Sequence, residues 1–167
     1  DAYVRIADCF FVQSDFNNAI DYYDSAITSR SMDTDYSLFQ KSLALGVTGH
    51  KNEKVQTLLA LISQYKRSAY LDDAKYEIGI AYLDLGQSPE AMPWFESILK
   101  DHANSSYVKK AMLRTGLIQF NSNQYDAALE TFKKVITLYP ATDEAIEALA
   151  GCKNIFIQTG KIDEYAS

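Results

Sequence analysis

The sequence is poor in the residues that interrupt helices, with 7 glycines and 3 prolines among 167 residues. It is rich in rings, with 12 tyrosines and 8 phenylalanines. Few helix breakers and many aromatic side chains predict helices that pack through bulky residues. The two cysteines, Cys9 and Cys152, lie far apart and outside any Cys-x-x-Cys pair, which excludes a zinc or thioredoxin-like motif by spacing.

Two further absences limit the class of function. Basic residues are outnumbered, 16 Lys and Arg against 22 Asp and Glu, so the formal net charge is −6. A general nucleic-acid binder needs a basic surface to neutralise phosphates, so we expect no nucleic-acid partner. No apolar run approaches the ~18 residues of a membrane-spanning helix, so we expect no membrane insertion by this segment.

Motifs that carry catalysis are also lacking. The sequence contains no phosphate-binding loop, nucleophile elbow or triad-like arrangement. The histidines, His50 and His102, have no carboxylate at metal-ligand spacing. We therefore expect a protein that is not an enzyme, with no catalytic residue, no cofactor and no metal site.

What the sequence does contain is an internal repeat. Residues that tolerate a left-handed backbone stand at intervals of 37 residues, namely Gly49, Gly86, Asn123 and Gly160. Ser14 occupies the analogous place 35 residues before Gly49. Such a recurring turn predicts a chain of helix pairs in which each turn ends one helix and starts the next.

Small residues follow the same register. Ala7, Gly79 and Gly116 lie seven residues before a predicted turn, and Ala19 and Ala128 are two of those that lie five residues after one. Two helices approach to about 8–10 Å only where the crossing point carries little bulk. These positions therefore predict close packing within each pair, and a leucine at 116 or 128 would overpack it.

Hydroxyl side chains mark the expected start of the first helix in several units. Ser68, Ser105 and Thr142 stand where each of these helices needs a residue to accept a hydrogen bond from its first turn. We predict all three as N-caps.

The aligned positions resemble the tetratricopeptide repeat (TPR) family. The first, third and fourth units match its pattern of small and aromatic residues, whereas the second departs from it at Lys41, Ser42 and Lys54. The matching residues are Tyr3, Ile6, Ala7, Phe10, Ala19, Tyr23 and Ala26; Ile78, Gly79, Tyr82, Ala91 and Phe95; and Gly116, Ala128, Phe132 and Pro140. The resemblance implies an all-α fold, a right-handed α-α superhelix of antiparallel helix pairs.

The resemblance also implies an organisation and a location. We expect a single TPR array with repeats at about 1–34, 35–71, 72–108 and 109–145 and a partial repeat at 146–167, as a fragment of a longer array. The 37-residue period and joints such as Tyr139-Pro140 resemble those of bacterial cell-envelope TPR proteins. We therefore expect the bacterial periplasm or envelope, with the cytoplasm as the other possibility.

The TPR register assigns one face of the first helix in each pair to a concave surface. This face is largely apolar and aromatic, which predicts a groove that accepts a peptide or helical segment of a partner protein. The groove residues expected from the register are Phe39, Tyr76, Ile80, Leu83, Leu113, Leu117 and Phe120. The alternative is a structural or oligomerisation segment, or a regulatory TPR region of a larger multidomain protein; the oligomeric state stays open.

Overall fold

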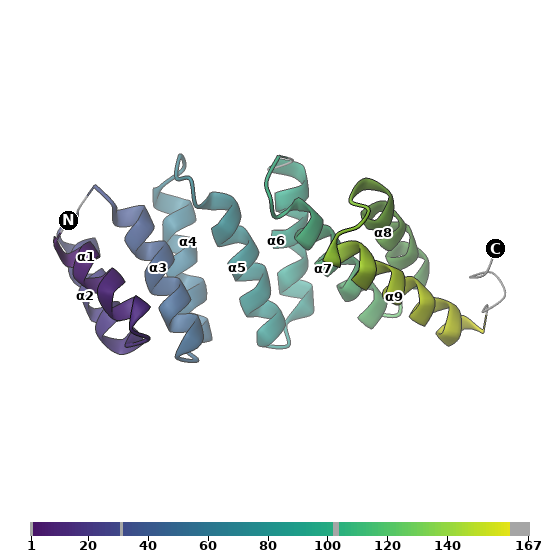
Figure 1. The fold of residues 1–167 in the computed structure, drawn as a ribbon, viewed down its shortest axis with the longest axis horizontal. Coiled ribbons are helices and arrows are strands. Elements are labelled where there is room, and N and C mark those ends of the chain that lie inside the picture. The colour runs from purple at the N-terminus through teal and green to yellow at the C-terminus, as the bar shows by residue number, and fades with distance from the viewer. Residues whose placement is uncertain (1, 31, 102–103, 161–167) are drawn as a thin grey trace. The chain divides into compact units, whose positions relative to one another are not determined.

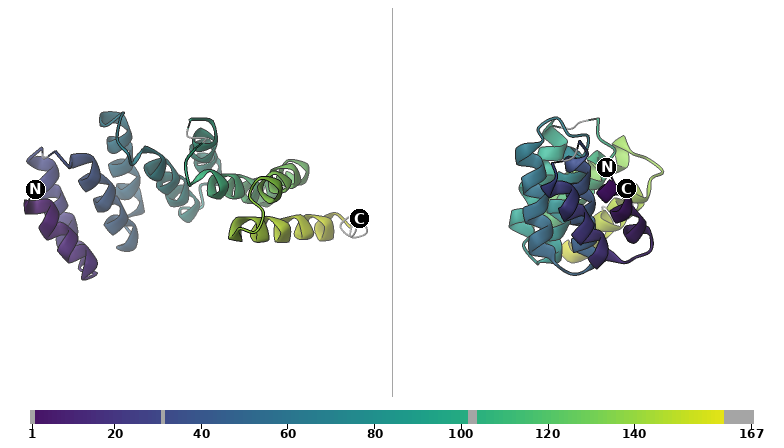
Figure 2. Two further views of the ribbon diagram at one scale, coloured as in Figure 1. Left: turned by 45° about the horizontal axis from the view of Figure 1, so that its top comes forward. Right: turned by 90° about the vertical axis from the view of Figure 1, so that its left-hand side faces the viewer.

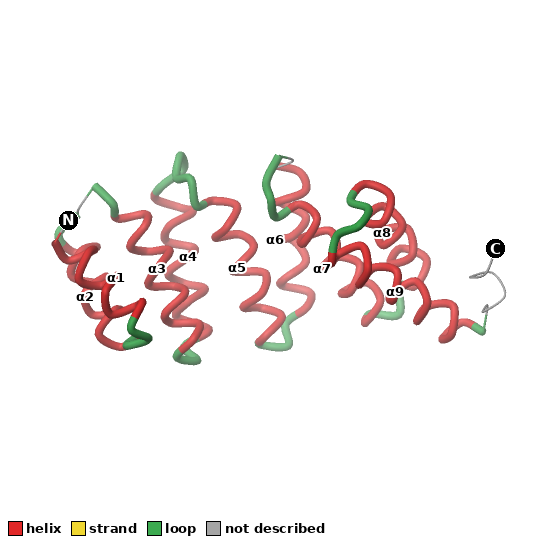
Figure 3. Tube along the Cα trace, viewed as in Figure 1, coloured by secondary structure: helices red, strands yellow, loops and turns green. Residues whose placement is uncertain are grey.

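A computed structural model describes residues 2–30, 32–101 and 104–160. Within these ranges the chain forms nine helices and no strand, joined by short loops (Figure 3). The expected all-α class is confirmed. None of the helices in the described ranges is both long and apolar enough to cross a membrane.

The chain divides into two compact units, residues 1–87 and 88–167. The division falls between the two helices of the predicted third repeat. Helices of the first unit are α1 (Ala2–Val12), α2 (Phe16–Thr28), α3 (Thr34–Val47), α4 (Lys51–Gln64) and α5 (Leu71–Asp84). Helices of the second unit are α6 (Ser88–Asp101), α7 (Val108–Asn121), α8 (Tyr125–Leu138) and α9 (Asp143–Thr159).

Consecutive helices within each unit lie side by side (Figures 1 and 2). In the first unit each helix contacts the next one along the chain, from α1 to α5. In the second unit the same holds from α6 to α9, and α7 also contacts α9 directly. The helices α7 and α9, the first helices of two successive pairs, therefore share one side of the second unit.

The predicted turns are confirmed by their backbone conformation. All five positions are left-handed: φ is 61° at Ser14, 83° at Gly49, 73° at Gly86, 59° at Asn123 and 71° at Gly160. Each follows the end of a helix, and Ser14, Gly49, Gly86 and Asn123 let the chain reverse into the next one.

The predicted N-caps are right at one position and wrong at two. Thr142 caps α9, since its hydroxyl accepts a hydrogen bond from the Ala145 amide at 3.2 Å. Ser68 and Ser105 instead accept from the amides of Tyr70 and Tyr107, at 3.2 and 3.1 Å. Each hydroxyl thus satisfies an amide of the joint two residues on, before the helix has begun.

Packing in the second unit explains why the repeat has small residues at fixed positions. Phe132 on α8 is fully buried, and its ring lies between two glycines, Gly116 on α7 and Gly151 on α9. A Cβ atom added at Gly116 would lie 2.6 Å from the ring, and one added at Gly151 would lie 2.5 Å from it. The predicted close packing at Gly116 is confirmed, and Gly151 completes it from the opposite side.

Candidate functional site

The predicted groove residues fall into two sets. Phe39 lies on α3, and Tyr76, Ile80 and Leu83 lie on α5, all in the first unit. The other three, Leu113, Leu117 and Phe120, lie on α7 in the second unit.

Several of these side chains already pack inside the fold. The exposed fraction is 8% for Phe39, 9% for Tyr76 and 3% for Leu113. Leu113 belongs to the core cluster around Phe132, and Leu117 and Phe120 pack partly against that cluster. Ile80 and Leu83 are half-buried. The set therefore supports the fold as well as any partner, and its role in binding stays a prediction.

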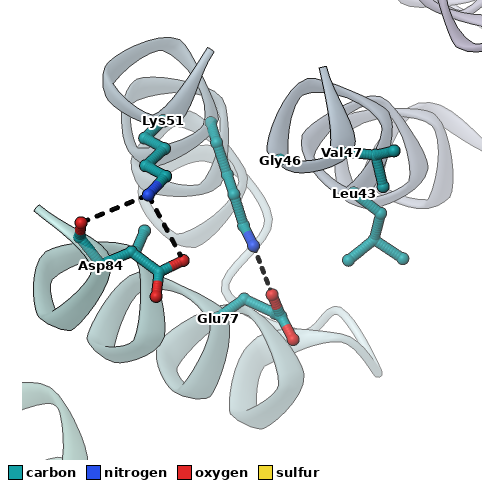
Figure 4. A pocket seen from close by; sticks show the side chains of 8 residues that line it. Leu43, Gly46, Val47, Lys51, Glu77 and Asp84 are labelled. Carbon is teal, nitrogen blue, oxygen red and sulfur yellow. Dashed lines mark hydrogen bonds and ion pairs between the residues drawn. The ribbon is translucent and has the colours of Figure 1, made fainter. Parts of the chain in front are cut away.

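A cavity of about 260 Å³ opens between α3, α4 and α5 in the first unit (Figure 4). Leu43 and Val47 project from α3 on one side of it, and Ala81 belongs to α5. Val47 is 63% exposed, so an apolar side chain at this site meets solvent. The full lining is Leu43, Gly46, Val47, Lys51, Lys54, Glu77, Ala81 and Asp84.

Two ion pairs connect α4 with α5 at this cavity. Lys54 Nζ lies 2.5 Å from Glu77 Oε2, with side-chain exposures of only 10% and 22%. Lys51 Nζ lies 3.9 Å from Asp84 Oδ2 and donates to the Asp84 carbonyl oxygen at 3.2 Å (Figure 4). The charges of the lining are thus paired with one another, and Leu43, Val47 and Ala81 provide its apolar part.

Lys54 gives this cavity its polar wall. It occupies the position held by small residues, such as Ala19 and Ala128, in other repeats. Gly46 makes room for it, because a Cβ atom at Gly46 would lie 3.2 Å from both Cδ and Nζ of Lys54. The sequence showed Lys54 only as a departure from the family pattern. Its partner Glu77 is 23 residues away and no spacing rule connects the two.

A cluster of aromatic rings lies at the other end of α3. Tyr70 stacks on Phe39 with ring centroids 5.2 Å apart and an interplanar angle of 13°, and its centroid lies 5.9 Å from that of Tyr36. The Asp8 carboxylate accepts hydrogen bonds from the hydroxyls of Tyr36, at 3.0 Å, and of Tyr23, at 2.6 Å. We call Tyr36, Phe39 and Tyr70 the ring cluster.

The hydroxyls around Asp8 are held in their neutral form. Burial and the hydrogen bond to Asp8 raise the pKa of Tyr36 to about 12. The same causes, burial first, raise the pKa of Tyr23 well above its usual range. Partial burial and the carboxylates of Asp35, Asp73 and Asp33 also raise the pKa of Tyr70.

The second unit has a different surface. Phe120 packs against Tyr125 with centroids 5.7 Å apart, and Lys109 on α7 pairs with Glu144 on α9 at 2.9 Å. Burial raises the pKa of the Glu144 carboxyl, but its interactions with Lys109 and the backbone outweigh that effect and hold the pKa below its usual value. A depression of about 400 Å³ runs along α8, lined by that helix alone.

Metal-binding chemistry is not found in the part of the chain that the structure describes. No group of three or more His, Cys, Asp or Glu side chains there could hold a metal ion. His50 lies in a turn, with Nδ1 2.9 Å from the Thr48 hydroxyl, whereas His102 lies outside the described residues. Cys9 and Cys152 form no disulfide.

Helix hairpins of this length, repeated with small residues at the crossing points, define the class of helical repeat proteins. A sequence model of the tetratricopeptide repeat matches residues 1–30, 73–105 and 110–142, which is more than half of the chain. The chain belongs to the TPR family, and the expected TPR solenoid fold is confirmed. The match does not include the second repeat, where Lys41 and Lys54 depart from the family pattern.

Individual known proteins are also similar to this chain in sequence or in fold. The outer membrane protein assembly factor BamD of Caulobacter vibrioides is 31% identical over 70 residues, which are 42% of this chain and 23% of that protein. The match therefore spans less than a quarter of that relative. Among solved structures, MamA (residue 41 to the end) from Desulfovibrio magneticus RS-1 superposes with a TM-score of 0.81 at 17% identity, covering 99% of this chain and 88% of that chain. YrrB, described as a TPR protein with an unusual peptide-binding site, gives a TM-score of 0.74 at 16% identity, covering 98% of this chain and 79% of YrrB.

These likenesses establish the fold and a coarse role. TPR proteins are in general non-enzymatic modules for protein–protein interaction, and the TPR fold implies protein or peptide partners.

Proposed function

We propose that this chain is a non-enzymatic interaction module that holds a peptide or helical segment of a partner protein. The observation that carries the proposal is the cavity between α3, α4 and α5, where exposed Val47 and half-buried Leu43 lie beside paired charges. An apolar side chain of the partner would enter between Leu43, Val47 and Ala81. A cavity of about 260 Å³ has room for one or two such side chains.

The remaining groove residues have graded roles in this proposal. Ile80 and Leu83 on α5 continue the contact surface of the first unit, and Leu117 and Phe120 form a separate contact surface in the second. Phe39, Tyr76 and Leu113 are buried and would support their neighbours more than touch the partner.

A matched pair of variants tests the cavity. Val47 and Val12 are both valines at the last position of a helix, α3 and α1, and both are well exposed, at 63% and 83%. Peptides selected from a random display library on the unmodified chain should bind Val47→Asp at least about tenfold more weakly, because a carboxylate would replace apolar contact. They should bind Val12→Asp unchanged. Equal affinity for all three proteins would contradict the cavity as the binding site.

We further propose that the protein acts as a scaffold in the bacterial envelope. The similarity to the outer membrane assembly factor and the Tyr139-Pro140 joint support this location. Alkaline phosphatase fused behind this segment in the full-length protein should be active, because the enzyme folds only after export. An inactive fusion that is made in normal amounts would place the protein in the cytoplasm instead.

A second role, self-association, is favoured by one feature of the second unit. Helix α9 exposes Ile146, Leu149 and Ile157, with exposed fractions of 67%, 48% and 51%. Exposed apolar side chains that recur along one helix are typical of an interface. Light scattering across a concentration series distinguishes this role, since self-association raises the apparent mass and Ile146→Asp should prevent the rise.

A further inference from the structure

The ring cluster of Tyr36, Phe39 and Tyr70 has a fixed geometry. Phe39 and Tyr70 are stacked within 13° of parallel, and Tyr36 is tilted by 55° against Tyr70. Tyr36 and Tyr70 are only partly buried, so this aromatic surface reaches solvent. Phe39 beneath them is buried and anchors the stack.

Asp8 holds one of these rings in place. Its Oδ1 accepts the Tyr36 hydroxyl at 3.0 Å and the hydroxyl of fully buried Tyr23 at 2.6 Å. Tyr36 is therefore fixed by a contact to a neighbouring repeat and keeps its orientation without a ligand. A preorganised ring loses less conformational entropy when a partner binds to it.

Tyr70 lies near carboxylates at the starts of α3 and α5. Asp33, Asp35 and Asp73 all act electrostatically on its hydroxyl. Acidic residues near a helix start have an ordinary role, because they complement the helix dipole. That role does not explain an aromatic stack beside them, and rings with carboxylates together form the surroundings that favour an organic cation.

We propose that the ring cluster, together with Asp35 and Asp73, binds an arginine side chain of the partner peptide. A guanidinium is flat and weakly hydrated, so it can stack on a tyrosine ring while its N–H groups point to carboxylates. A metal ion is the less suitable occupant, because no metal-binding group was found among the described residues. This inference rests on the proposed function, since it adds a second contact of the same partner.

The position of the cluster predicts the spacing in the partner. Phe39 and Gly46 mark the two ends of the surface along α3, seven residues apart. Seven residues of helix span about 10 Å at ~1.5 Å per residue. An extended peptide rises ~3.3 Å per residue, so about three steps separate the arginine from the apolar residue that enters the cavity.

Short synthetic peptides test both contacts separately. The probes are acetylated and amidated Arg-Ala-Ala-Leu and the reversed Leu-Ala-Ala-Arg, each with a counterpart that carries citrulline, which is neutral but has nearly the shape of arginine. NMR titration of the complete chain follows the ring signals of Tyr36 and Tyr70 and the methyl signals of Leu43 and Val47. In one of the two orders, the arginine peptide should shift both groups of signals and bind at least about fivefold more tightly than its citrulline counterpart.

Variants of the carboxylates complete the test. Asp35→Asn combined with Asp73→Asn should remove at least about fivefold of the arginine preference, whereas Asp126→Asn on α8 should leave it unchanged. Thermal melts of the same proteins show whether they stay folded, and Tyr70→Leu gives a second variant that removes the ring without removing a charge.

The outcomes separate the inference from the proposed function. Methyl shifts at Leu43 and Val47 that are equal for arginine and citrulline, with unmoved tyrosine rings, overturn the arginine site and leave the cavity proposal standing. Ring shifts that depend on arginine, without methyl shifts, support the arginine site and contradict the cavity. No shift of the rings with any peptide overturns the inference.

Discussion

Replacing Gly116 by alanine tests the packing of the second unit. A Cβ atom at this position would lie 2.6 Å from Phe132 Cε1, which is 0.8 Å inside the 3.4 Å limit of ordinary contact. The ring has little room to move away, because the backbone of Gly151 lies on its opposite edge, where even an added Cβ atom would be 2.5 Å from it. The variant must therefore distort a buried ring that neighbouring helices hold on both sides.

The magnitude follows from two opposing effects. Overpacking a well-packed core costs about 1–3 kcal/mol, and the two-sided confinement of Phe132 places this variant near the upper end. Alanine is favoured over glycine within a helix by about 1 kcal/mol. The expected net loss is thus about 2 kcal/mol, which corresponds to roughly 4–8 °C in Tm for a chain of this length.

A control and a rescue make the test specific. Gly46→Ala places its Cβ 3.2 Å from the flexible end of Lys54 rather than 2.6 Å from a confined ring, so it should cost clearly less in thermal unfolding than Gly116→Ala. Phe132→Leu should reduce the cost of Gly116→Ala, giving a double variant that loses less stability than the two single variants together. A Gly116→Ala protein as stable as the unmodified chain would refute the packing argument.

The remaining predictions concern packing, charge and pH. Ala128→Leu, at a fully buried position, should cost about 1–3 kcal/mol in thermal unfolding, and an unchanged melt would contradict the predicted helix crossing. Lys54→Ala and Glu77→Ala should each destabilise the chain by about 2 kcal/mol in urea unfolding, because each leaves a largely buried charge without its partner. The double variant should lose clearly less stability than the two single variants together, and strict additivity would contradict the ion pair. The pKa of Tyr36 is raised from 10.0 to about 12, so between these pH values the folded state keeps a proton that the unfolded state loses. The free energy of unfolding should therefore fall as the pH rises from about 10 to about 12. In urea unfolding, Tyr36→Phe should make this fall smaller, and an unchanged pH dependence would argue against the hydrogen bond to Asp8.

The fold was predictable because its signals recur. One left-handed turn proves little, but Ser14, Gly49, Gly86, Asn123 and Gly160 in one register define a repeat, and all five have positive φ. The exact residues at which helices begin were harder to predict. Ser68 and Ser105 have the composition of N-caps, yet each lies in a joint whose own amide takes the hydroxyl.

The candidate site was predictable only in part. The register assigned residues of α3 and α5 to the groove, and both helices line the cavity, but through Leu43, Val47 and Ala81 rather than through the expected residues. It could not show that Lys54 reaches Glu77, because that contact joins two helices of different repeats and depends on the space left by Gly46.

The burial of the predicted groove residues was the second property that the sequence did not reveal. The register places Phe39 and Leu113 on the inner face but does not reveal how deeply they pack. Phe39 is covered by Tyr70, a joint residue with no place in the helix pattern, and Leu113 joins the Phe132 core. Exposure depends on neighbours that are distant in sequence, so it had to come from the structure.

The position of a bound peptide tests the central claim most directly. A peptide selected on the unmodified chain, carrying isotope labels, is mixed with the protein, and nuclear Overhauser effects are recorded between peptide protons and protein methyl groups. Contacts from an apolar peptide side chain to Leu43 and Val47 are the predicted result. A peptide that binds tightly and contacts only other surfaces, such as the α9 side chains Ile146 and Leu149, would contradict the account.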